Sequence, residues 1–247
     1  MKRNKRSFKD WLLDILYPRH IKCVFCGGEL NELAEKDCCE NCASALPYIT
    51  NACPKCGNVM LPDEVGVCFE CKKKNFEFEQ AVAVFSYTGK IAKAVHDFKY
   101  EGSKPSYEPL GEFMCETLAA WGIEPDLITF VPMHKKKQKR RGFNQAELLA
   151  RFVAAKFNIP CAEIVEKIKE NQSQASLSYR ERQENIKGCY QLKADYRKLV
   201  KGLVVLLIDD IFTTGATSNE VSSVLKHMGV KKVYVLTLAH TERDRNY

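Results

Sequence analysis

"VVLLIDDIFTTGAT", residues 204–217, places two adjacent carboxylates directly after a run of apolar residues. Val204 to Ile208 are β-branched or leucine side chains without polar alternation, which predicts a strand buried on both faces. Ionised carboxylates repel each other and are costly to bury without a partner, so we expect this acid pair, Asp209 and Asp210, at the exposed carboxyl edge of a sheet. Ligands bind at that edge in open parallel sheets, which makes the acid pair a candidate site.

From about residue 77 the sequence alternates predicted strands with predicted helices. Strands are expected at residues 78–87, 126–134, 204–208 and 230–240. Helices are expected at residues 88–102, 107–122, 144–158 and 218–228, with Asn144 as the cap of the third. Strands that alternate with helices predict an α/β domain over residues 77–247, with a parallel sheet covered on both faces.

The segment "TTGAT" leads from the acid pair into the last predicted helix. Its small side chains and its glycine leave backbone N–H groups exposed in a concave turn at a helix amino terminus, which suits a phosphate dianion. The candidate phosphate-binding residues are Thr213, Thr214, Gly215, Ala216 and Thr217. Two carboxylates beside that turn suit vicinal hydroxyls or a hydrated Mg²⁺ ion. A phosphate next to a diol describes a ribose 5-phosphate.

Basic residues gather in three runs, although the formal net charge is only +7. The runs occupy residues 2–6, 72–74 and 134–141, of which the last is "HKKKQKRR". Such runs contact phosphates in some proteins and are only solvated in others. The run at 134–141 follows a predicted strand, so we expect Arg140 and Arg141 to face a phosphate at the edge of the sheet.

Eight of the twelve cysteines form four C-x2-C pairs within residues 21–76. A disulfide scaffold would require an oxidising compartment, whereas two C-x2-C turns complete a four-thiolate zinc site. The spacing repeats after about thirty residues, which predicts two zinc ribbons in succession. The expected ligands are Cys23, Cys26, Cys39 and Cys42 for the first ion, and Cys53, Cys56, Cys68 and Cys71 for the second.

Spacing alone also allows a cross-braced arrangement, in which the first cysteine pair shares an ion with the third. In either arrangement a segment this short needs its ions in order to fold, and closed four-thiolate sites leave no position for catalysis. The remaining cysteines have no base beside them in sequence and are expected to be buried thiols: Cys38, Cys115, Cys161 and Cys189.

Residues 1–20 are expected to form an amphipathic helix. The apolar side chains that recur at helical spacing are Phe8, Trp11, Leu12, Ile15 and Leu16. Asp10 and Asp14 interrupt the apolar stretch, which argues against a signal peptide and against a transmembrane helix. The helix is expected to pack on its own chain or on a partner, and peripheral membrane association is not predicted. We therefore expect a cytoplasmic protein.

Several segments together resemble known proteins. The stretch at 204–217 resembles the signature of type I phosphoribosyltransferases, which bind phosphoribosyl pyrophosphate (PRPP). "VPMHKKKQKRRGFNQAELLA" at 131–150, "QASLSYRERQENIKG" at 174–188 and the "CVFCG" region are similar to the ComF family of competence proteins, specifically its ComFC members. This resemblance covers nearly the whole chain. It implies an α/β fold of the type I phosphoribosyltransferase class, preceded by a small double zinc ribbon.

The resemblance also implies roles for the candidate residues. Asp209 and Asp210 would hold the ribose 2′ and 3′ hydroxyls, and Thr213 to Thr217 would hold the 5-phosphate. A mobile basic loop that carries Arg140 and Arg141 would close over the pyrophosphate. Mg²⁺ and these fixed cations would neutralise the pyrophosphate as it leaves, while the ribosyl carbon becomes cationic.

Two departures from related enzymes narrow the expected function. Purine-salvage relatives carry an aspartate where this chain has Thr213, and a threonine cannot act as the base toward a purine ring at neutral pH. Hypoxanthine and guanine are therefore not the expected substrates. Glutamine-dependent relatives need an amino-terminal cysteine nucleophile, whereas this chain begins Met1-Lys2.

Membership of the ComF family would imply a role in natural transformation. We expect a DNA-uptake protein that binds PRPP and single-stranded DNA, with Phe25 and Phe69 as stacking surfaces in the ribbons. The alternative is an active phosphoribosyltransferase, whose unknown acceptor would bind in a hood near residues 77–110 and 171–190. The chain has no G-x4-GK[ST] loop, so a motor would be a partner, such as the helicase-like ComFA subunit of some relatives.

Overall fold

The computed structural model describes residues 21–31, 34–100, 107–169 and 186–241. The strands are β1 (Gln80–Ser86), β2 (Leu127–Phe130), β3 (Val165–Lys167), β4 (Tyr190–Leu192), β5 (Val204–Phe212) and β6 (Lys232–His240). The helices are α2 (Glu40–Ala43), α3 (Phe69–Lys73), α4 (Gly89–Tyr100), α5 (Tyr107–Trp121), α6 (Lys135–Arg141), α7 (Gln145–Phe157) and α9 (Ala216–His227), with 3-10 turns η1 (Glu35–Asp37) and η4 (Ala194–Tyr196). The helix expected at residues 1–20 lies outside these ranges.

Four strands form one parallel sheet in the order β1-β6-β5-β2. β5 is hydrogen-bonded on both edges, with Leu206 beside Tyr234 of β6 and Ile128 of β2. An interior strand of this kind is also buried on both faces, which explains the unbroken apolar run in its sequence. The expected parallel α/β sheet is confirmed. The other two strands, β3 and β4, form a separate antiparallel pair.

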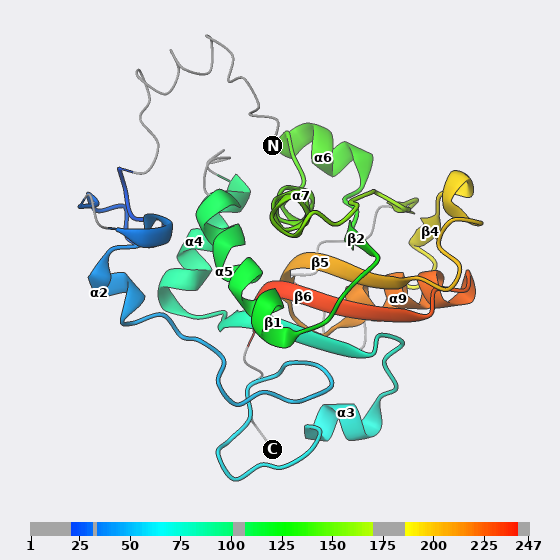
Figure 1. Ribbon diagram of the computed structural model, residues 1–247, viewed down its shortest axis with the longest axis horizontal. Coiled ribbons are helices and arrows are strands. Elements are labelled where there is room, and N and C mark those ends of the chain that lie inside the picture. Colours follow the sequence, from blue (N-terminus) through cyan, green and yellow to red (C-terminus); the bar gives the residue numbers. More distant parts are fainter. Residues whose placement is uncertain (1–20, 32–33, 101–106, 170–185, 242–247) are drawn as a thin grey trace.

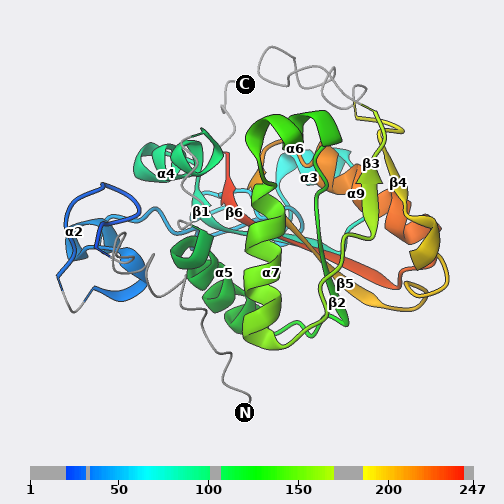
Figure 2. The same ribbon diagram turned by 90° about the horizontal axis from the view of Figure 1, so that it is seen from above.

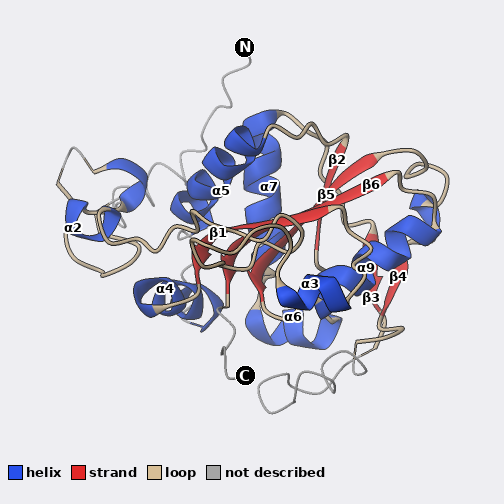
Figure 3. Ribbon diagram, turned by 90° about the horizontal axis from the view of Figure 1, so that it is seen from below, coloured by secondary structure: helices blue, strands red, loops and turns tan. Residues whose placement is uncertain are grey.

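Helices cover both faces of the sheet (Figure 1). On one face, Leu206 and Ile208 of β5 join a core formed with α4, α5 and α7. On the opposite face, Val205 and Leu207 join a core formed with α9 and the β3–β4 pair, the face turned toward the viewer in Figure 3. Successive side chains of β5 thus supply two separate cores, as the pleat of a strand requires.

Each zinc ribbon completes the core on one face of the sheet. Phe25 of the first ribbon packs against Phe85 and Phe113, on the side of α4 and α5 seen in Figure 2. Phe78, directly after the second ribbon, lies edge-on to Phe212 in the core around α9. The ribbons are therefore packed into the larger domain, one on each face.

The outer edge of β1 is covered by the segments around the ribbons. The N–H of Ser86 donates to the carbonyl of Pro47 at 2.9 Å, and the N–H of Ala81 donates to the carbonyl of Lys55 at 2.9 Å. Gly57 comes so close that an added Cβ would lie 2.8 Å from the Ala81 carbonyl oxygen. These contacts satisfy an edge that would otherwise be open to pairing with another chain.

Two expected element boundaries were wrong at the candidate site. The strand expected to stop at Ile208 continues through Phe212, because residues beyond the acid pair remain in register with β6. The last helix begins at Ala216 and not at residue 218. The acid pair therefore lies within a strand, and the expected phosphate-binding turn includes the first turn of α9.

The basic segment and one aromatic residue also differ from expectation. The run at 134–141, expected as a mobile loop, forms α6, which ends at Gly142 in the left-handed conformation. Phe25, expected as a surface for base stacking, is only 2% exposed because it fills the core beside Phe85. Phe69 is 52% exposed. Within the described ranges, no helix is long and apolar enough to cross a membrane.

Candidate functional site

A cavity of about 580 Å³ lies at the carboxyl ends of β2 and β5. Its walls come from the end of α4, from the β2–α6–α7 segment, from the β3–β4 pair and from the β5–α9 turn. The polar and charged residues that line it are Lys99, His134, Lys137, Arg140, Arg141, Asn144, Gln145, Lys167, Tyr190, Asp209, Asp210, Thr213, Thr217 and Ser218. Cavities of this volume accommodate small-molecule ligands.

The acid pair, Asp209 and Asp210, is partly buried in the wall of the cavity. Oδ1 of Asp209 accepts a hydrogen bond from the N–H of Asp210 at 2.9 Å. Burial, followed by repulsion from Asp210, raises the pKa of Asp209 to about 8. The pair was expected at the exposed carboxyl edge of the sheet. Its partial burial in a continuing strand makes the charged form of Asp209 costly and aims both carboxylates into the cavity.

Only part of the expected phosphate-binding segment lines the cavity. Thr213, Gly215 and Thr217 do so, together with Ser218, which the sequence analysis missed. Thr214 is buried, and its Oγ1 accepts a hydrogen bond from the backbone N–H of residue 216 at 3.3 Å. Its hydroxyl therefore contacts the start of α9, whose N-cap residue is Gly215.

Gly215 is required by the shape of this turn. Its φ of +75° is strained for residues with side chains, and an added Cβ would lie 2.5 Å from the ring of Phe212. The turn can therefore bring its backbone against the aromatic core without a side chain in the way. This close packing fixes the start of α9 at the cavity wall.

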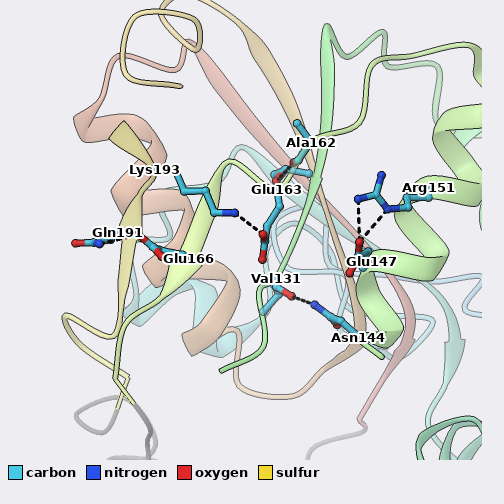
Figure 4. Close-up of polar contacts among 10 residues, drawn as sticks. Val131, Asn144, Glu147, Arg151, Ala162, Glu163, Glu166, Gln191 and Lys193 are labelled. Atoms are coloured by element: carbon cyan, nitrogen blue, oxygen red, sulfur yellow. Dashed lines mark hydrogen bonds and ion pairs between the residues drawn. The ribbon is translucent and has the colours of Figure 1, made fainter. Parts of the chain in front are cut away.

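The basic wall of the cavity consists of Lys137, Arg140 and Arg141 of α6. The first residues of α7 hold it in place. Asn144 caps α7 by accepting from the N–H of Ala146 at 3.1 Å, and it donates to the carbonyl of Val131 at 3.0 Å (Figure 4). Buried Gln145 accepts a hydrogen bond from Nη1 of Arg141 at 2.9 Å. These contacts connect the start of α7 to the end of β2 and to α6, so the arginines line the cavity from a hydrogen-bonded helix.

Crowding among these cations has an electrostatic consequence. Burial, followed by repulsion from Arg141 and Lys99, lowers the pKa of Lys137. Repulsion of this kind is relieved when an anion enters among the cations. The basic wall is therefore suited to a strongly anionic ligand.

Three residues that the sequence analysis missed complete the cavity. Lys99, at the end of α4, places Nζ 2.8 Å from Oδ2 of Asp210, and this attraction raises the pKa of Lys99 against the opposing effect of burial. Lys167 and Tyr190 come from β3 and β4. No pattern in the sequence relates these residues to the acid pair, because only the tertiary fold brings them together.

The β3–β4 pair is joined by side-chain contacts on its outer surface. Nε2 of Gln191 donates to Oε1 of Glu166 at 2.8 Å, and Lys193 forms an ion pair with Glu163 (Figure 4). Tyr190, next to Gln191, is buried, and this burial raises the pKa of its hydroxyl. The pair thus holds a protonated phenol at the side of the cavity.

The cysteines form two clusters in which all four sulfurs lie within 4.8 Å of one another. One cluster is Cys23, Cys26, Cys39 and Cys42, and the other is Cys53, Cys56, Cys68 and Cys71. This grouping follows the sequential arrangement and not the cross-braced one. Four thiolates at such separations fit two structural zinc sites of a double zinc ribbon.

The two clusters share the same local geometry. The N–H of Cys39 donates to Sγ of Cys23 at 3.5 Å, and the N–H of Cys68 donates to Sγ of Cys53 at 3.2 Å. In the first ribbon, Nζ of Lys90 also approaches Sγ of Cys42 at 3.3 Å. Donors of this kind neutralise part of the excess negative charge that four thiolates leave on a zinc ion.

Comparison with known families agrees with this two-part organisation. The chain matches the model of the double zinc ribbon domain over residues 12–72 and that of the phosphoribosyl transferase domain over residues 144–246. It is 28% identical over 236 residues to competence protein F of Haemophilus influenzae, covering 89% of this chain and 97% of the relative. The chain therefore contains matches to a double zinc ribbon domain and to a phosphoribosyl transferase domain, and it is similar to competence protein F along most of its length.

Other relatives of this chain carry related names. The competence protein ComFC of Bacillus subtilis is 28% identical over 190 residues, covering 72% of this chain and 73% of the relative. The DNA utilization protein YhgH of Escherichia coli K12 is 28% identical over 212 residues, covering 82% of this chain and 90% of the relative. These relatives are thus named for competence or for DNA utilization.

Solved structures that are similar to this chain include phosphoribosyltransferases. The glutamine PRPP amidotransferase of Bacillus subtilis is 21% identical with a TM-score of 0.38, covering 55% of this chain and 26% of that chain. An adenine phosphoribosyltransferase is 13% identical with a TM-score of 0.35, covering 60% of this chain and 84% of that chain.

The cysteine clusters predict about two zinc ions per chain, measured by elemental analysis of purified protein. Cys39→Ser should reduce this to about one. Cys38→Ser is the matched control and should retain both ions, because burial raises the pKa of the Cys38 thiol to about 12 and its Sγ donates to the neighbouring carbonyl of Cys39. Loss of an ion from the Cys38 variant would show that the ligand assignment is wrong.

The raised pKa of Asp209 predicts a pH-dependent cost in stability. The unfolded chain releases this proton at about pH 4, whereas the folded chain releases it at about pH 8. Between these two pH values the folded state binds more protons, so the free energy of unfolding falls as pH rises. Asp209→Asn removes this cost. Thermal unfolding should show a gain in Tm over the parent that grows from about pH 5 to about pH 8.

The exposed residue Asp195 provides the control, since Asp195→Asn should leave Tm unchanged across the same range. A gain for Asp209→Asn that is constant with pH would contradict the assigned pKa. The measurement is made without chelator so that the zinc ribbons stay intact.

Proposed function

We propose that this protein binds PRPP in the cavity as part of DNA uptake. The proposal rests on one observation: the acid pair, the β5–α9 turn and the basic wall of α6 all line the same cavity. PRPP has a diol between a 5-phosphate and a pyrophosphate. The cavity offers two carboxylates between a turn of small residues and a group of cations, so each part of the ligand finds a chemically matched wall.

In this proposal each wall has one role. Backbone N–H groups of the residues in this turn that line the cavity, together with the hydroxyls of Thr217 and Ser218, bind the 5-phosphate at the start of α9. Asp209 and Asp210 accept hydrogen bonds from the ribose hydroxyls. The cations of α6 bind the pyrophosphate. Deprotonation of Asp209 is favoured when its carboxylate accepts such bonds, which links ligand binding to the charge of the acid pair.

Transfer of the phosphoribosyl group is the alternative function of the same site. It requires stabilisation of departing pyrophosphate, which Arg140 and Arg141 would supply, and a nucleophile from an acceptor. The expected hood segment at 171–190 falls mostly outside the described residues. A search for pyrophosphate release in the presence of PRPP and candidate acceptors separates transfer from binding alone.

Binding of single-stranded DNA is the second part of the proposed function, and it is supported by Phe69. This ring is half-exposed on α3, and Nζ of Lys73 lies 3.9 Å from its centre. Lys72 precedes Lys73 in the same helix. An exposed aromatic ring among cations suits base stacking and phosphate contact. Movement of the strand would require a separate motor protein, for which a ComFA-like subunit is the expected partner.

The double variant Asp209→Asn/Asp210→Asn tests the diol site. We expect its affinity for PRPP, measured by titration calorimetry, to fall by about 100-fold or more, because neutral amides accept weaker hydrogen bonds than carboxylates. Circular dichroism should show an unchanged fold. Asp195→Asn is the control for a surface acid and should bind like the parent. Parent-like affinity of the double variant would refute the assignment.

The DNA-binding surface is tested with Phe69→Ala and Lys72→Glu/Lys73→Glu. Fluorescence anisotropy with an oligonucleotide should show weaker binding by about tenfold at low salt, while PRPP affinity is unchanged. Phe157→Ala is the control, because it removes a partly exposed aromatic ring from a different helix, α7; this variant should bind DNA normally. Normal DNA binding by the first two variants would mean that the second ribbon is a surface for a protein partner.

A further inference from the structure

The cation of Lys99 occupies one side of the acid pair. Its Nζ lies 2.8 Å from Oδ2 of Asp210, and both side chains are largely buried, with 20% and 17% of their surfaces exposed. This oxygen is one that a Mg²⁺ ion would take as a ligand, since carboxylate oxygens are the ligands that Mg²⁺ prefers. The expected metal and the observed lysine therefore compete for the same position.

The position of Lys99 is fixed by its helix. The apolar face of α4 is buried through Ile91, Ala94, Val95 and Phe98. At the end of α4, Nε2 of Gln145 donates to the carbonyl of Phe98 at 3.4 Å, while the same side chain accepts from Arg141. One buried glutamine thus connects the backbone beside Lys99 to the basic wall. A cation held in this way is a built part of the cavity.

Electrostatics make the lysine and a metal ion alternatives. Ionised Asp210 is stabilised by a nearby positive charge, and Lys99 supplies that charge at hydrogen-bonding distance. A Mg²⁺ ion bound directly to the same carboxylate would lie within a few ångströms of Nζ, where two cations repel strongly in a partly buried site. Because Mg²⁺ also loses its water ligands reluctantly, the resident ammonium has the advantage.

We propose that Lys99 supplies at the acid pair the positive charge expected from Mg²⁺, so that this chain binds a phosphoribosyl ligand without a metal ion on Asp210. The inference rests on the proposed PRPP site and assigns the cation that organises it. In the complex, the ammonium of Lys99 holds the carboxylate of Asp210 in orientation and leaves its other oxygen to accept a ribose hydroxyl. The 5-phosphate and pyrophosphate are bound by the other walls.

The test compares PRPP binding by calorimetry in buffer freed of divalent ions by resin and in the same buffer with excess MgCl₂. Chelators are avoided because they would remove zinc from the ribbons. We expect the parent to bind PRPP in both buffers with affinities within about threefold of each other. Lys99→Met should lose about tenfold or more in affinity without Mg²⁺ and should recover most of it with Mg²⁺, because the metal then enters the vacated position.

Two further variants serve as controls. Lys99→Arg keeps the positive charge and should retain binding without Mg²⁺. Its binding separates the loss of charge in the methionine variant from a general effect of substitution at this position. Lys93→Met removes an exposed lysine from the same helix and should behave like the parent. Addition of MgCl₂ without ligand should raise the Tm of the Lys99→Met variant and leave that of the parent unchanged.

The outcomes distinguish this inference from the proposed function. Binding by the parent only when Mg²⁺ is present would overturn the role of Lys99 and leave the PRPP site standing. Equal binding by Lys99→Met and the parent without Mg²⁺ would overturn it as well. Failure of the parent to bind PRPP in either buffer would overturn both proposals.

Discussion

The central constraint in this protein is that β5 is an interior strand and also carries the acid pair. Its ladder is complete on both edges and its apolar side chains fill two cores, so the chain cannot shift to relieve the two carboxylates. The result is a raised pKa at Asp209 and an ion pair between Asp210 and Lys99. A buried carboxylate with a raised pKa persists because the surrounding structure fixes its position, and perturbed pKa values of this kind cluster at functional sites.

The zinc ribbons belong to the same structural unit. Each supplies aromatic or sulfur-bearing residues to one core, and their flanking segments cover the edge of β1. In addition, α4 carries Lys90 beside Cys42 in its first turn and Lys99 beside Asp210 in its last turn. One helix of 12 residues thus contacts both a zinc cluster and the acid pair. A displacement of this helix would alter both contacts, which gives the ribbon a structural connection to the cavity.

Local patterns allowed much of this architecture to be predicted. The repeat of C-x2-C pairs and the apolar run of β5 are properties of short segments, and so is the cap at Asn144 that the structure confirms. The misplaced residues depended on distant contacts. Phe25 is buried because Phe85 and Phe113, far along the chain, enclose it, and Lys99 meets Asp210 across more than a hundred residues. The run of lysines and arginines at 134–141 also gives no indication that a contact with α7 will help to fix it as a helix.

The charge balance of the cavity favours retention of an anion over proton transfer. Among the described lining residues, five lysines and arginines face the two carboxylates of the acid pair. Thr213 offers no base, and Asp210 is engaged by Lys99. Cations that bind pyrophosphate equally well before and during its departure increase affinity without lowering the barrier to transfer. Under the proposed function, such walls favour the binding of PRPP over its turnover, and faster transfer requires an acceptor that brings an electron-rich nucleophile of its own.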